Sequence, residues 1–141
     1  MEIKKFDNNL IAFDFDNDYL NATDLLKAYN ETRVYSDSNK RMDNFLRTKG
    51  VKEFIKVLES DALKSAPDFQ AVIQSKNEFG RSSGTWVHRI LAYRLAAWLS
   101  PEFELFVYKT FDDVLKDKLK YQQMQLDRLW DKEDIKDLYN K

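Results

Sequence analysis

The 141-residue chain contains no cysteine, two prolines, three glycines and a single histidine. Without cysteine there is no disulfide framework and no thiolate metal site, and one histidine excludes a multi-histidine metal site. The glycines, Gly50, Gly80 and Gly84, form neither of the glycine-rich patterns that cradle phosphates. No nucleophile-elbow pattern presents a serine to His88. We therefore expect a protein that is not an enzyme and that uses no metal or other cofactor.

Long hydrophobic runs are also missing from the chain. No stretch approaches the roughly 18 apolar residues that cross a membrane, and the first residues lack an apolar leader segment. We expect a cytoplasmic protein with no membrane partner. Hydrophobic residues nevertheless make up 43% of the chain and aromatic residues 14%, which indicates one folded domain with a buried core.

The chain as a whole is almost neutral, but its middle segment is net basic. The net charge is −1, yet residues 33–94 hold twelve basic and seven acidic residues, and both flanking segments are net acidic. A basic middle between acidic ends favours one polyanion-binding face, although chance unevenness in a charged surface gives the same pattern.

The first forty residues predict a β-hairpin followed by a helix. Residues 2–6 and 10–15 read as two strands, and the second alternates like a half-buried strand. Asn21 is a good N-cap for a helix over 21–30. Residues 30–40 are predicted to form a polar loop.

The rest of the chain predicts helices interrupted by one strand-like segment, which makes the fold class α+β. Residues 41–60 indicate two helices with a break near Lys49 and Gly50. A strand around 71–73 leads into a turn rich in small residues. An apolar helix is then predicted over 87–99, and Ser100 with Pro101 starts the next helix.

Two features could be read as a catalytic or metal-binding site, namely the alternating aspartates and the single histidine. Asp14, Asp16 and Asp18 alternate, but the glycine and glutamate of a calcium loop are missing, so a solvated hairpin turn is the better account. His88 is interpreted as a group that caps or packs at the start of a helix.

Two groups of donors suit a nucleic acid better than a substrate. Serine hydroxyls, backbone N–H groups and basic side chains contact phosphates or enter a minor groove. The first group lies in the glycine- and serine-rich turn, where Arg81 is expected to make the closest contact, and the second around the helix pair. The candidate DNA-binding residues are Lys76, Asn77, Arg81, Ser82 and Ser83 in the turn, and Lys40, Arg41, Arg47, Thr48, Lys49 and Lys52 near the helices. A solvated hairpin tip with ordinary surface lysines is the alternative on charge alone.

Residues 19–31 (YLNATDLLKAYNE) and 84–111 (GTWVHRILAYRLAAWLSPEFELFVYKTF) resemble the KilA-N domain of phages and large DNA viruses. The resemblance spans most of residues 10–115, and its motifs are specific in combination. That family is similar in fold to the fungal APSES domain, which implies a winged helix-turn-helix-like unit that binds DNA without catalysis. Such a domain often forms the N-terminal module of a phage antirepressor or regulator. Many relatives have proline after the Val-His pair, where this chain has Arg89.

We therefore expect a KilA-N-like DNA-binding domain over 1–115 and a helical extension or linker over 116–141. The expected partner is double-stranded DNA, in the host cytoplasm or nucleoid if a phage encodes the chain. The alternative is a protein-interaction module with little DNA affinity, which dimerises through its C-terminal helices or binds a repressor or host factor. The acidic ends and the weak overall charge favour it. Four leucines lie at heptad-compatible positions, but Gln122 interrupts the pattern and its register is lost after Trp130, which leaves fewer heptads than a coiled coil needs: Leu115, Leu119, Leu126 and Leu129.

Overall fold

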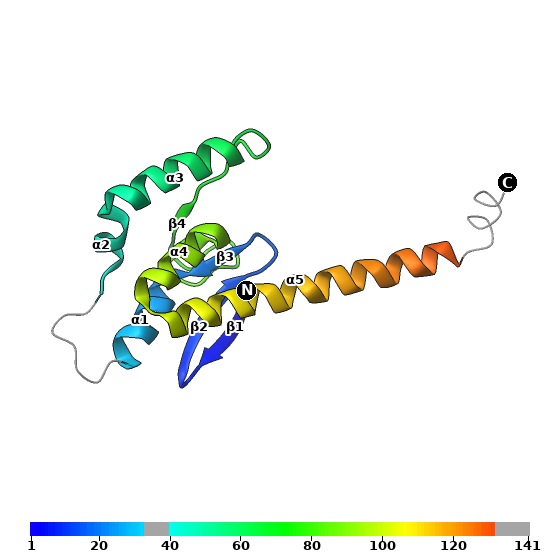
Figure 1. Cartoon of the computed structure of the whole chain (residues 1–141), viewed down its shortest axis with the longest axis horizontal. Coiled ribbons are helices and arrows are strands. Elements are labelled where there is room, and N and C mark those ends of the chain that lie inside the picture. The colour runs from blue at the N-terminus through cyan, green and yellow to red at the C-terminus, as the bar shows by residue number, and fades with distance from the viewer. Residues whose placement is uncertain (33–39, 132–141) are drawn as a thin grey trace. The chain divides into compact units, whose positions relative to one another are not determined.

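The structure is a computed structural model, and it describes residues 1–32 and 40–131 (Figure 1). These residues form an α+β fold and divide after Tyr108 into two compact units. Each described helix is too short or too polar to cross a membrane. The polar loop predicted over 30–40 falls mostly outside the described residues. The elements are β1 (Glu2–Phe6), β2 (Asn9–Asp14), β3 (Tyr19–Asn21), α1 (Ala22–Thr32), α2 (Met42–Arg47), α3 (Lys49–Ala62), β4 (Val72–Ser75), β5 (Gly84–His88), α4 (Arg89–Leu99) and α5 (Pro101–Trp130).

The strands form one antiparallel sheet in the order β1-β2-β3-β5-β4. The predicted N-terminal hairpin is confirmed, because β1 pairs with β2 along its whole length. β4 and β5 form a second hairpin at the opposite edge, and its two strands are joined by the loop 76–83. The sheet therefore keeps this loop at the edge away from β1.

Both faces of the sheet are covered at β2, where the sequence predicts a half-buried strand. Ile11 and Phe13 are fully buried, but Ala12 between them is only 1% exposed. Ala12 packs with Tyr19 and Trp86 on the other face of the sheet. The alternation of large and small residues along β2 therefore reflects side-chain size, because the small residue is buried as well. Helices α1 and α4 contact each other and the sheet.

The predicted caps of α1 and α5 are confirmed. The Asn21 side-chain oxygen accepts a hydrogen bond from the N–H of Asp24 at 3.1 Å. The Asp24 carboxylate in turn accepts the N–H of Ala12 at 3.0 Å, which ties the first turn of α1 to β2. The Ser100 hydroxyl accepts the N–H of Phe103 at 3.3 Å, so a new helix starts immediately after α4.

Helices α2 and α3 are separated by one residue, Thr48, which has extended backbone angles. The predicted break near Lys49 and Gly50 is therefore displaced by one or two residues. Gly50 lies inside α3, where an added Cβ would lie 3.2 Å from Nη2 of Arg94, a tight contact with the end of a flexible side chain. Gly50 therefore does not end a helix, as the sequence suggested, but lies in the first turn of α3.

The predicted helix over 87–99 begins two residues too early. Val87 and His88 belong to β5, where they pair with Leu20 and Tyr19 of β3. Helix α4 starts at Arg89, after the strand has ended. The apolar spacing that includes Val87 fits a helix, but the ladder with β3 overrides that local preference.

Candidate nucleic-acid interface

Helix α3 carries three exposed lysines on one face. Lys49, Lys52 and Lys56 are spaced by three and four residues, so helical periodicity aligns them in a single stripe. Val51 lies on the opposite side and is only 4% exposed. The sequence interpretation named Lys49 and Lys52 but missed Lys56. The i, i+3, i+7 spacing was the signal that could have included it.

Contacts at its middle and near its C-terminal end hold α3 on the domain. The guanidinium of Arg94 in α4 lies 4.9 Å from the centre of the Phe54 ring. Near the C-terminal end of α3, the Glu59 carboxylate accepts the N–H of Ala71 at 3.4 Å, just before β4 begins. The lysine stripe, which we call the α3 lysine stripe, is therefore presented by an anchored helix.

Two predicted cations at α2 share one carboxylate. Arg41 and Arg47 each lie 3.2 Å from Asp43, and their side chains are 73% and 66% exposed. Arg47 also donates to the side chain of Asn44 at 2.8 Å. The Thr48 hydroxyl donates to the backbone carbonyl of Asn44. Both arginines are accessible, but Asp43 offsets part of their charge.

Lys40 points into the domain. Its ammonium group donates to the carbonyl of Trp98 at 2.6 Å and lies 4.6 Å from the centre of that indole ring. A second ring, that of Tyr29, lies 5.4 Å away. A cation at the last carbonyls of α4 stabilises the negative end of that helix, so Lys40 has a structural use that its charge alone did not reveal.

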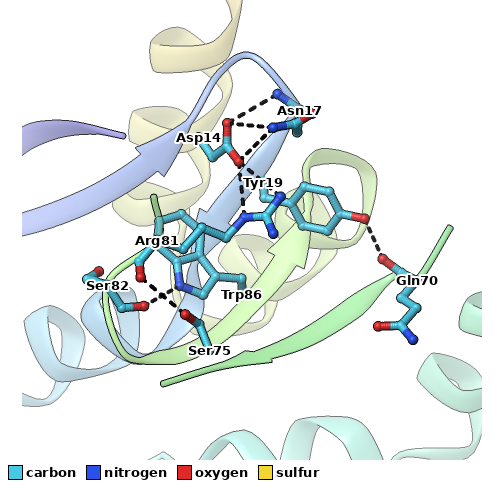
Figure 2. Close-up of polar contacts among 8 residues, drawn as sticks. All are labelled: Asp14, Asn17, Tyr19, Gln70, Ser75, Arg81, Ser82 and Trp86. Carbon is cyan, nitrogen blue, oxygen red and sulfur yellow. Dashed lines mark hydrogen bonds and ion pairs between the residues drawn. The ribbon is translucent and has the colours of Figure 1, made fainter. Parts of the chain in front are cut away.

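Arg81 also turns inward, and its guanidinium lies against the Tyr19 ring and Asp14 (Figure 2). Its Nε donates to Oδ2 of Asp14 at 3.0 Å, its Nη2 lies 3.0 Å from the same oxygen, and its guanidinium stacks 5.0 Å from the Tyr19 ring centre. The paired side chains are 16% and 11% exposed. Asn17 donates two further bonds to Asp14 from its side chain. The residue expected to make the closest DNA contact is thus paired within the domain.

The base of the loop 76–83 is fixed by the residues next to Arg81 (Figure 2). The Ser75 hydroxyl donates to the Arg81 carbonyl at 3.2 Å, and the Trp86 indole N–H donates to the Ser82 carbonyl at 2.8 Å. The buried Asn21 amide donates to the Ser82 hydroxyl and to the carbonyl of Ser83, both at 3.2 Å. Asn21 therefore caps α1 and holds the loop at the same time.

Of the predicted loop residues, Lys76, Asn77 and Ser83 are exposed. The structure thus separates the candidates into an exposed set and a set that holds the fold. α3 and β4 run in opposite directions and are joined by residues 63–71 (Figure 1).

His88 caps α4, as its position in the sequence suggested. Its Nδ1 accepts the N–H of Ile90 at 3.3 Å, and its ring makes edge contacts with Tyr19 and Phe69. Burial lowers the pKa of His88 below its ordinary value of 6.5, the charge of Arg89 lowers it further, and Asp18 opposes both. A neutral imidazole is what a helix cap requires here.

The described residues contain no group of three or more histidine, aspartate or glutamate side chains arranged to hold a metal ion. Asp14 of the alternating aspartates is occupied by Arg81 and Asn17. The acidic turn is thus built around internal hydrogen bonds.

Known proteins resemble this chain over most of its length. A family model described as the KilA-N domain matches residues 4–117. The chain is 30% identical over 103 residues to Protein kilA of Escherichia phage P1, a match that covers 70% of this chain and 36% of that protein. The chain thus spans about a third of the curated relative's length. No solved structure matches.

Proposed function

Because this chain belongs to the KilA-N domain family, whose members are generally DNA-binding domains, we propose that it binds double-stranded DNA. The observation that carries the proposal is the α3 lysine stripe of Lys49, Lys52 and Lys56. In this arrangement α3 lies along the major groove, and the loop 76–83 contacts the duplex beside it as a wing.

The dimensions and charge of α3 suit that role. A B-DNA major groove is about 12 Å wide and admits an α-helix. The first turn of α3 holds no acidic side chain, so no carboxylate within it offsets the partial positive charge of the helix end. Arg41 and Arg47 extend the basic surface along α2, and Lys76 adds a cation on the wing. Glu53 is exposed next to the stripe, and in the proposed complex its carboxylate would accept from a cytosine amino group.

The same proposal includes a regulatory role. The relation to a phage protein supports action as a phage or prophage regulator, for example an antirepressor, in the host cytoplasm or nucleoid. Mapping the bound sites on a phage genome tests this role, because a transcription regulator occupies promoter-proximal sites and sites scattered without regard to promoters contradict it.

Fluorescence anisotropy with a pool of random duplexes tests DNA binding itself. Replacing all three lysines of the α3 lysine stripe by alanine is expected to weaken binding at least about tenfold, since each phosphate contact contributes favourable counterion release. Lys5→Ala removes a cation that is also exposed, from β1 at the far edge of the sheet, and is expected to bind normally. Equal binding by the triple variant and the wild-type chain would contradict the proposed interface.

A second candidate function rests on the C-terminal part of α5. Leu115, Leu119, Leu126 and Leu129 are 53%, 56%, 59% and 44% exposed, and they follow heptad spacing around Gln122. A second copy of the chain would bury these leucines in a two-helix seam. Light scattering of the wild-type chain and of a Leu119→Glu, Leu126→Glu variant tests this. A wild-type monomer at high concentration contradicts it.

A further inference from the structure

Phe79 is the most exposed large hydrophobic side chain among the described residues. It lies in the loop 76–83 and is 90% exposed. Burying such a ring is worth about 1.5–3 kcal/mol, and the fold makes almost no use of it. The ring therefore contributes little to folding and is available to a partner.

The backbone at Phe79 is also unusual for its residue type. The N–H of Arg81 donates to the carbonyl of Glu78 at 3.1 Å, which closes a tight turn with Phe79 and Gly80 at its centre. Both central residues have positive φ angles, 55° for Phe79 and 74° for Gly80. Turns of this kind normally use asparagine, aspartate or glycine at the first central position, because a bulky side chain is strained there. The chain thus keeps a strained, exposed aromatic residue at the turn tip.

The loop below this turn is held by fixed contacts on both sides. Arg81 forms an ion pair with Asp14, and the Ser75 hydroxyl donates a hydrogen bond to the Arg81 carbonyl. The tip itself is nearly neutral, since exposed Lys76 and Glu78 offset each other and the Arg81 charge is paired. Attraction to phosphates is therefore weak at this tip, and its distinctive group is the ring.

We propose that Phe79 inserts from the minor groove between two base pairs of the bound duplex, which unstacks that step and kinks the DNA. The inference rests on the proposed DNA-binding function and names how the wing takes part in it. Apolar wedges of this kind kink duplexes by about 20–90°. Pyrimidine–purine steps unstack most easily, so the wedge would favour sites with a TA or CA step beside the segment bound by α3.

Two readouts on one short duplex test the wedge. The duplex carries 2-aminopurine at a TA step, whose fluorescence rises on unstacking, and a dye pair at its ends, whose energy transfer rises on bending. Saturating wild-type protein is expected to increase both signals. Phe79→Asn, which suits the turn, is expected to bind with an unchanged salt dependence while losing most of both increases. Glu78→Gln, a matched exposed substitution in the same loop, is expected to keep them.

The outcomes separate the wedge from DNA binding. If wild-type protein binds but changes neither signal at any 2-aminopurine position, the wedge is wrong and the proposed function stands. The same conclusion follows if Phe79→Asn gives wild-type signals, or if Glu78→Gln loses them equally. In those cases the Phe79 ring does not enter the duplex, and a protein surface is the other partner to test for it. If wild-type protein binds no duplex, the proposed function fails and the wedge fails with it.

Discussion

Replacing Arg81 by alanine is expected to destabilise the domain without changing its charge contacts with DNA. Removing one partner of a buried ion pair costs about 3–5 kcal/mol. Asp14 keeps its hydrogen bonds from Asn17 and is slightly exposed, so we expect a loss of about 2–3 kcal/mol in the free energy of unfolding. The stacking of the guanidinium on Tyr19 is lost as well.

Urea unfolding followed by tryptophan fluorescence measures this loss, since Trp86 is fully buried beside the pair. A double-mutant cycle with Asp14→Ala is expected to give a coupling free energy of about 1–3 kcal/mol. Lys76→Ala is the control and is expected to change stability by less than about 0.5 kcal/mol. Wild-type stability of Arg81→Ala, together with a salt dependence of DNA binding that is shallower by about one unit, would refute the reasoning. That pair of results would place the guanidinium on a phosphate.

Three further predictions concern the residues that shape the loop and the helix starts. The single histidine, His88, is expected to titrate below pH 6.5 by proton NMR, because its folded-state pKa is lowered. The unfolded chain then binds the proton more tightly, so this contribution to stability is present above about pH 6.5 and is lost as the pH falls through the window below it. A midpoint at or above 6.5 contradicts this. Gly84→Ala is expected to destabilise by more than about 2 kcal/mol, because φ is +132° and an added Cβ would lie 2.9 Å from Thr23 Oγ1. Gly80→Ala, with φ +74° but open space, is expected to cost only about 1 kcal/mol in the same thermal melts, and equal losses contradict the steric account. Asn21→Asp keeps the cap acceptor but loses the amide donor to the loop, so faster hydrogen exchange is expected at residues 82–84 while the first turn of α1 stays protected. Unchanged exchange in the loop argues against the double role of Asn21.

Local signals in the sequence predicted the parts of the fold that depend on neighbouring residues. Asn21 and Ser100 cap their helices because a short polar side chain needs only an N–H three residues ahead. The N-terminal hairpin follows from alternation and one turn. The start of α4 was misplaced because the pairing of Val87 with Leu20 is a long-range contact.

The use of each cation could not be read from the sequence for the same reason. Arg81 is 67 residues away from Asp14, and Lys40 is 58 residues away from Trp98. Only the folded chain shows that these two charges are used internally. By contrast, the α3 lysine stripe depends on spacing within one helix, and Lys49 and Lys52 were already among the candidates named from the sequence.

The salt dependence of DNA binding tests most directly whether the α3 lysine stripe contacts the DNA backbone. The measurement is the slope of log affinity against log salt for the wild-type chain and for the variant with alanine at Lys49, Lys52 and Lys56. Loss of three phosphate contacts is expected to make the slope shallower by about 2–3 units, since each contact contributes about 0.9. An unchanged slope in a folded triple variant would contradict the account.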